Sequence, residues 1–192
     1  MESISGNEII EIGDQIWQTK NLNVGKFRNG DLIPQVLSNE EWEQRTKEGV
    51  SAWCYYNNES DNGEKYGRLY NWWAVNDIRG LAPKGYHVPS NSEWQKLIKF
   101  LGGMMRAGNS MKNSSGWKNN GNGSNDSGFS ALPGGKRHLF GSFESIDEAY
   151  WWSSTESNSY MAWFYLLYFN DGEVIENQAY KDAGMYVRCI KD

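Results

Sequence analysis

Aromatic side chains dominate the apolar part of this sequence. The 192 residues include ten Trp, eleven Tyr and seven Phe, so aromatics make up 15% of a chain whose hydrophobic content is only 39%. Large rings bury the area that Leu and Ile usually provide, and together with 21 Gly they favour short strands and turns. A helical bundle is therefore disfavoured. An enzyme that depends on histidine is disfavoured as well, because the chain has only His87 and His138.

Length and charge narrow the class of protein further. A chain of 192 residues can bury one sizeable core, so we expect a single domain over residues 1–192. The formal net charge of −5 argues against a nucleic-acid partner, because no basic field is present to displace counterions from phosphates. No apolar run approaches the roughly 20 residues that span a bilayer, so we expect no membrane insertion. Residues 1–5 lack a basic region followed by an apolar stretch, so we expect no signal peptide in this chain.

Capping-box motifs predict two short helices. Residues 38–41 have the spacing that caps a helix start, and Gly49 follows as a stop signal. A second box at residues 90–93 precedes apolar side chains at helical spacing, which predicts a helix over residues 91–101.

Alternating apolar runs around turn signals predict strands at both ends of the chain. Residues 9–18 form two such runs around a Gly-Asp turn, which is typical of a hairpin. The Asp-Gly pair at 171–172 interrupts the run 162–175 in the same way. We expect a last strand over residues 185–190. Helices followed by an aromatic sheet indicate an α+β fold with two short helices, a twisted, mainly antiparallel sheet and long loops.

Two polar segments separate these elements. Residues 106–128 are rich in Gly, Asn and Ser, and we expect a long loop there that Met111 and Trp117 anchor. Residues 57–64 combine carboxylate and amide side chains, whose oxygens suit Ca²⁺, although their spacing is not that of an EF-hand. The sequence leaves a calcium site and an ordinary solvated loop as alternatives for this segment, and predicts no other cofactor.

The segment 157–186 is the strongest candidate for a recognition surface. It combines Tyr side chains, which offer a large rigid area with a polar tip, with acidic and amide residues. Within it, the strand 162–169 is apolar on both faces, so it is either buried on both sides or exposes its rings. We assign Trp151, Trp152 and Trp163 to the core. The candidate ligand-binding residues are Tyr160, Tyr165, Tyr168, Glu173, Ile175, Glu176, Gln178, Tyr180 and Asp182.

A series of short segments also carries a family signature. They are Gly13–Trp17 with Asn21-Leu22, Ala52–Tyr56, Tyr66–Trp72, Pro83–Ser90, Glu93-Trp94, Gly128–Gly135, Trp152–Glu156, Ala162-Trp163 and Val187–Cys189. Their order and spacing resemble the Fibrobacter succinogenes major paralogous domain family over nearly the whole chain. The resemblance implies a C-type lectin-like fold, in the branch that also contains formylglycine-generating enzymes.

The same resemblance implies a location and a kind of partner. Members of the family are mostly surface lipoproteins or secreted modules of Bacteroidetes, and closely similar domains serve as variable proteins of diversity-generating retroelements. An extracellular or cell-surface protein, or a component of a phage particle, is therefore expected, with a cell-surface protein or glycan as partner. Ala82 stands where many members have Cys, so an additional bridge is missing. One disulfide between Cys54 and Cys189 and two buried free thiols remain alternatives.

Three functions compete at this point. The first is a non-catalytic ligand-binding or adhesion module that uses residues 157–186, with a retroelement-diversified receptor-binding protein as its phage-type form. The second is an enzyme of the formylglycine-generating type, which needs a reactive thiol at Cys54 or Cys189. The third is a fimbrial or surface-coat component whose exposed rings mediate assembly. We favour the first, because the sequence has no G-x-S-x-G, H-E-x-x-H or P-loop motif.

Overall fold

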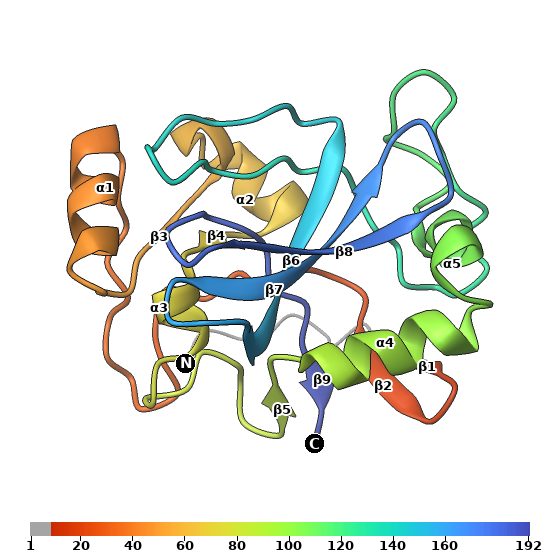
Figure 1. Ribbon diagram of the computed structural model, residues 1–192, viewed down its shortest axis with the longest axis horizontal. Coiled ribbons are helices and arrows are strands. Elements are labelled where there is room, and N and C mark those ends of the chain that lie inside the picture. The colour runs from red at the N-terminus through yellow and green to blue at the C-terminus, as the bar shows by residue number, and fades with distance from the viewer. Residues whose placement is uncertain (1–8) are drawn as a thin grey trace.

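A four-stranded antiparallel sheet joins the two ends of the described chain. The computed structural model describes residues 9–192, so the expectation of no signal peptide at residues 1–5 lies outside the described part. The predicted hairpin at 9–18 is confirmed, with Gly13 at φ +65° in its turn, where a side chain would be strained. The strand order is β1 (Ile9–Ile12), β2 (Gln15–Gln18), β9 (Ile190–Lys191) and β5 (Tyr86–His87) (Figure 1).

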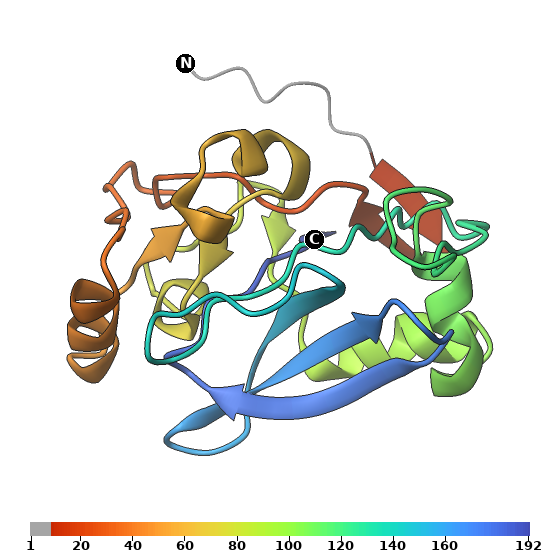
Figure 2. The same cartoon turned by 90° about the horizontal axis from the view of Figure 1, so that it is seen from above.

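A second antiparallel sheet runs through the middle of the molecule. Its order is β6 (Glu148–Glu156), β7 (Met161–Tyr168) and β8 (Val174–Tyr180), so β8 is an edge strand, and Figure 2 shows it as the outermost strand on one side. The hairpin predicted at 171–172 is confirmed, with unbroken pairing between β7 and β8. A short third sheet pairs β3 (Trp53–Cys54) with β4 (Leu69–Tyr70).

The strand expected over residues 185–190 is regular only at its end. Met185 forms a single bridge to β4 and Tyr186 a single bridge to β6, and regular pairing begins at Ile190 in β9. The segment therefore connects all three sheets instead of extending one of them.

Five α-helices lie among residues 9–192, where the sequence predicted two. They are α1 (Asn39–Lys47), α2 (Asp61–Tyr66), α3 (Trp72–Val75), α4 (Asn91–Phe100) and α5 (Met104–Met111). The helices α1 and α4 are the two that the capping boxes predicted. Ser38 and Ser90 accept a hydrogen bond from the third backbone N–H of their helices, at 3.0 and 3.4 Å. None of these helices is long and apolar enough to cross a membrane.

The helix α5 corrects the expectation of a long loop from residue 106. Gly and Asn give this segment low helix propensity, and no side chain caps its start, so local signals miss it. Packing stabilises the helix instead: Ala107 and Met111 are fully buried. At Gly108 a Cβ would lie 2.6 Å from the carbonyl oxygen of Gly172, so only glycine allows this approach to the β7–β8 turn. The rest of the segment is irregular, and Met111 and Trp117 are its buried anchors, as predicted.

The middle sheet separates two aromatic cores. Successive strand residues point to opposite faces, so Trp151 enters one core and Trp152 the other, and both are confirmed as core residues. The strand β7 is likewise buried on both sides over most of its length. In the first core, Trp94 of α4 contacts four rings with centroid distances of 4.9 to 6.1 Å, those of Trp17, Phe129, Trp151 and Tyr165.

Cys54 and Cys189 are both buried free thiols, so the disulfide alternative is wrong. Cys54 lies in β3 and packs into the first core, whereas Cys189 precedes β9 and packs into the second. Burial in separate cores keeps the two sulfurs apart.

Candidate ligand-binding site

The β7–β8 hairpin leaves one end of one face accessible. Met161 and Trp163 of β7 lie on this face opposite Tyr180 and Gln178 of β8. Tyr180 is 53% exposed and Tyr160, just before β7, is 74% exposed, whereas the other three side chains are half-buried. We call these five residues the recognition strip. It combines three aromatic rings, a thioether and a primary amide on one strip of surface.

Hydrogen bonds fix the backbone beneath the recognition strip. The Asn158 Oδ1 atom accepts from the backbone N–H groups of Tyr160 and Met161, at 2.9 and 3.0 Å. The buried ammonium of Lys181 pairs with the Glu156 carboxylate and donates to the Ser159 carbonyl at 2.9 Å. The turn that presents Tyr160 is therefore held from both sides. A fixed turn with exposed rings reduces the entropy that binding would otherwise remove.

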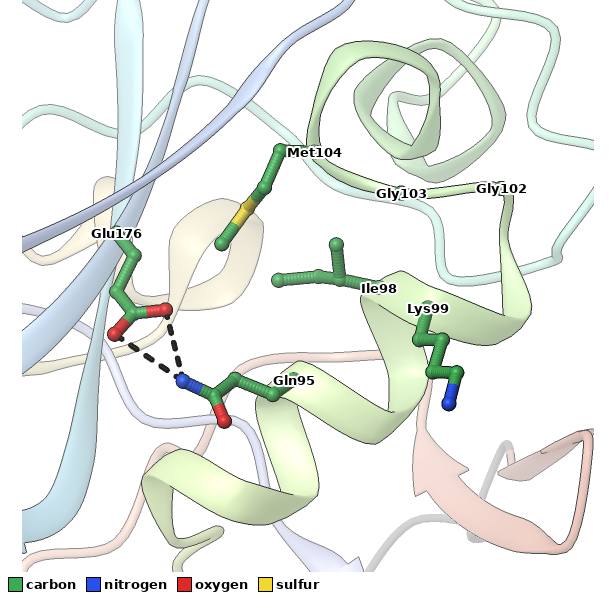
Figure 3. Close-up of a pocket in the computed structure, with 7 residues that line it drawn as sticks. All are labelled: Gln95, Ile98, Lys99, Gly102, Gly103, Met104 and Glu176. Atoms are coloured by element: carbon green, nitrogen blue, oxygen red, sulfur yellow. Dashed lines mark hydrogen bonds between the residues drawn. The ribbon is translucent and has the colours of Figure 1, made fainter.

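A groove of about 580 Å³ begins at Glu176. Glu176 lies two residues before Gln178 in β8, on the same face of the sheet. Ile98 and Met104 provide apolar walls, and Glu176 and Lys99 lie on opposite sides (Figure 3). The remaining lining residues are Gln95, Gly102 and Gly103. We call this feature the α4–β8 groove.

Two amide groups orient the Glu176 carboxylate at this groove. Gln95 Nε2 donates to both carboxylate oxygens, at 3.2 and 3.4 Å (Figure 3). Asn91 Nδ2 donates to the same carboxylate at 3.1 Å. Both donors come from α4, whose start is fixed by its capping box. In the described part of the chain, no cationic side chain forms a salt bridge with Glu176. The groove therefore presents a fixed negative charge beside apolar walls.

The prediction that Tyr165 contacts the ligand is wrong, because this side chain is fully buried. Its ring stacks on Trp94, and its hydroxyl donates to Asn91 Oδ1 at 2.6 Å. Burial, with a smaller contribution from the Glu176 charge, raises the pKa of Tyr165 above its ordinary value. Tyr165 supports the α4 contact beneath the surface instead of forming part of the surface.

Four other candidates lie away from the recognition strip. Tyr168 and Ile175 are on the opposite face of the hairpin, packed against the second core. Glu173 lies in the β7–β8 turn, where its N–H donates to Asp171 Oδ1 at 2.8 Å. The Asp182 carboxylate accepts from Trp73 Nε1 at 3.4 Å, and burial raises the pKa of this carboxyl. The nine candidates therefore do not form one surface.

The structure brings together Tyr160, Gln178 and Tyr180, with Glu176 at the neighbouring groove. It adds Trp163, which we had assigned to the core and which is only half-buried. The signal for Trp163 lies in the hairpin register: it pairs with the polar Gln178 near the open end of the hairpin. The half-exposed Met161 pairs with Tyr180 by the same register.

The polar segment 57–64 is folded more regularly than expected. It spans a 3₁₀ turn (Tyr56–Asn58) and most of α2. The amides of Asn58 and Asn62 donate to the carbonyls of Leu37 and Tyr56, at 2.7 and 2.9 Å. Within residues 9–192, no three His, Cys, Asp or Glu side chains are grouped as a ligand set for a metal ion. Calcium binding by this segment stays a prediction.

The groups considered for chemistry have structural contacts. His87 lies between two carboxylates, with Nε2 at 2.8 Å from Glu93 and Nδ1 at 2.8 Å from Asp192. Burial raises the pKa of both Cys54 and Cys189 to about 12. Both thiols are therefore protonated at neutral pH, and a protonated thiol is a poor nucleophile.

Fold and site together define an α+β domain with a surface strip of aromatic and amide side chains at the edge of an antiparallel sheet. Residues 10–191 match the family model of the Fibrobacter succinogenes major domain (Fib_succ_major), and the chain belongs to this family. The match confirms the resemblance that the sequence segments carry. No curated protein and no solved structure matched the chain.

Proposed function

We propose that this chain is a non-catalytic ligand-binding or adhesion module with a C-type lectin-like fold, located outside the cell or at its surface. Its ligand is a cell-surface protein or glycan, and the recognition strip contacts it. The observation that carries the proposal is the pair of exposed rings, Tyr160 and Tyr180, on a turn and a strand end whose backbone is hydrogen-bonded. Rigid aromatic anchors with little entropy to lose are what recognition surfaces use.

The chemistry of the recognition strip suits either class of ligand. The faces of Trp163 and Tyr180 can stack on the apolar face of a sugar or on a side chain, while the Gln178 amide supplies a donor and an acceptor. The non-catalytic part of the proposal is supported by the two thiols, which burial keeps protonated. A nucleophile of the formylglycine-generating type would need an accessible, ionisable sulfur.

A screen on a glycan array and on intact cells, with calcium and with chelator, tests the proposal. We expect binding by the native chain, and loss of that binding in the double variant Tyr160→Ala/Tyr180→Ala. The matched control is Phe140→Ala, which removes a ring that is 62% exposed elsewhere on the surface. Binding that survives the double variant, or falls equally in the control, would show that the recognition strip is not the binding surface.

A retroelement-diversified receptor-binding protein is the second candidate. Its supporting observation is that Tyr160, Gln178 and Tyr180 are at least partly exposed and lie outside the two cores, so the fold can tolerate substitution there. Tyr165 is excluded from such a set by its burial. Sequencing related copies from one genome tests this candidate. Variation concentrated at the recognition strip supports it, and uniform variation along the chain contradicts it.

A further inference from the structure

The outer edge of β8 carries backbone groups that no other strand uses. The N–H of Lys181 donates to the Tyr160 carbonyl at 3.0 Å. The backbone N–H and C=O groups of every second residue before Lys181 therefore also point toward β7. Backbone polar groups alternate in direction along an antiparallel strand, so those of Val174, Glu176, Gln178 and Tyr180 point outward. Within the described residues, β8 pairs only with β7.

This edge lacks the usual permanent protection against pairing. The strand is seven residues long, contains no Pro, and pairs with β7 without a bulge. The Tyr180 carbonyl already accepts the N–H of Ala183 at 3.0 Å, and the Asn177 side chain forms a local cap, since its Oδ1 accepts the N–H of Gln178 at 2.8 Å. A side-chain cap of this kind is reversible, because an incoming strand can replace it with a backbone carbonyl.

The α4–β8 groove lies where side chains of an added strand would enter. Glu176 points from β8 into the groove, and side chains of a neighbouring strand on the same sheet face would lie beside it. Ile98 and Met104 offer apolar contact there, and the oriented Glu176 carboxylate offers a partner for a cation. Lys99 repels a cation from the other side of the groove.

We infer that an extended, basic segment of a protein partner binds by adding a fourth strand to the outer edge of β8. Main-chain hydrogen bonds to Glu176, to Gln178 and from the N–H of Tyr180 hold the segment. A Lys or Arg side chain pairs with Glu176, and apolar side chains two residues away contact Ile98 and Met104. The inference rests on the proposed binding function and gives it a mode and a chemical class of partner.

Charge favours a basic partner over a second copy of this chain. Pairing two β8 edges in a register centred on Glu176 would set the two Glu176 carboxylates opposite each other, and each chain has a formal net charge of −5. Like charges across a strand pair are destabilising. A basic segment meets the same edge with opposite charge.

The test uses three fluorescein-labelled heptapeptides that alternate Thr with Val, Leu or Ile and carry Lys at the central position. Anisotropy measures their binding, and amide hydrogen exchange follows Glu176, Gln178 and Tyr180. Control peptides carry Glu in place of Lys, or N-methyl groups on alternate amides. We expect at least one Lys peptide to bind and to protect these amides, and we expect both kinds of control to bind about tenfold more weakly or not at all.

Three variants separate the backbone and side-chain parts of the contact. Gln178→Pro removes an outward N–H that β7 does not use, so the hairpin is retained while strand addition is blocked. Asn177→Ala removes the cap and is expected to tighten binding about threefold. Glu176→Lys should reverse the preference, so that the Glu peptide binds better than the Lys peptide. Circular dichroism and thermal unfolding verify that each variant is folded.

The outcomes divide cleanly. Failure of all three Lys peptides to bind, equal binding of the N-methylated peptides, or concentration-dependent dimerisation that Gln178→Pro abolishes would overturn the inference. Tyr160→Ala leaves the peptide contact intact but removes a ring of the recognition strip. Loss of cell or glycan binding in Tyr160→Ala, with no peptide binding, would leave the proposed function standing and remove strand addition. Peptide binding by a chain that binds no cell and no glycan would support strand addition and contradict the proposed function.

Discussion

The ring of Tyr165 stacks on the indole of Trp94, with ring centroids 4.9 Å apart and an interplanar angle of 22°. This contact joins β7 to α4 directly beneath the α4–β8 groove. Tyr165→Ala should lower the free energy of unfolding by about 3–5 kcal/mol, because it removes a fully buried ring. Tyr165→Phe should lower it by only about 1 kcal/mol, through the lost hydrogen bond to Asn91. Urea unfolding measures both, and Tyr160→Ala is the exposed control, with an expected change within about 0.5 kcal/mol.

Arg188 is fully buried, and no carboxylate of residues 9–192 forms a salt bridge with it. Its guanidinium donates to Asn21 Oδ1 at 2.9 and 3.0 Å and to the carbonyls of Gln18 and Phe129 at 3.2 and 2.6 Å. Burial lowers its pKa to about 9, so it remains charged at neutral pH. Arg188→Met removes all four bonds, although Asn21 Oδ1 still accepts from Trp151 Nε1 at 2.8 Å, and should destabilise the chain by about 3 kcal/mol in chemical denaturation. The surface variant Arg45→Met should change stability by less than about 1 kcal/mol, and similar losses in both variants would contradict this account.

The two thiols should be unreactive in the native chain. Burial raises the pKa of Cys54 and Cys189 to about 12, and neither is bridged. A thiol-reactive chromophore should therefore detect no fast sulfur under native conditions and two after unfolding in denaturant. A reducing agent should leave the melting temperature unchanged. A melting temperature that falls with reductant would point to a disulfide after all.

The contact of His87 with Glu93 and Asp192 should make stability depend on pH. Burial alone would lower the pKa of His87, but the hydrogen bonds and charges of the two carboxylates outweigh it and raise the pKa above its ordinary 6.5. The stabilisation is therefore fully present below pH 6.5 and is lost as the pH rises through the folded-state value. For Glu93, burial would raise the pKa, but bonds from Ser90 and His87 lower it below 4.5. That stabilisation is lost as the pH falls through the lowered value.

Thermal unfolding between pH 4 and pH 9 measures the effect of this contact. The difference in melting temperature between the native chain and the His87→Gln variant should be largest at mildly acidic pH, near pH 5–6, and smaller at pH 9. Ser92→Ala, on the same helix start, is the control and should shift the curve by a constant amount. A pH-independent difference for His87→Gln would show that the ring contributes by packing alone.

Local signals predicted the parts of this fold that local chemistry determines. The hairpin at 9–18, the Asp171-Gly172 turn and the two capped helices each depend on residues within a few positions of one another. The helix α5 could not be found in this way, because its stability comes from burial of Met111 and from the close approach at Gly108. Tertiary packing overrode a sequence that favours loops.

The candidate site shows the same division. The exposure of Tyr160 and Tyr180 agrees with a surface role, yet Tyr165 has the same side chain and lies in the core. It is on the same face of β7 as Trp163, but two residues further along the strand, where Trp94 of α4 covers it. The oriented state of Glu176 depends on Asn91 and Gln95, which lie about eighty positions earlier in the chain. No spacing rule connects residues so far apart, so this part of the site required the three-dimensional structure.

The four-stranded sheet has a mechanical consequence. Because β9 lies between β2 and β5, a pulling force applied at residues 9 and 192 acts first on the ladder between the first hairpin and the last strand. Gln18 and Leu22 add backbone bonds to Cys189 and Val187 in the same region, at 3.0 and 2.8 Å. The hairpin β7–β8 belongs to a different sheet and lies outside this path of tension. A domain tethered through its two ends can therefore carry load while its recognition strip keeps its shape.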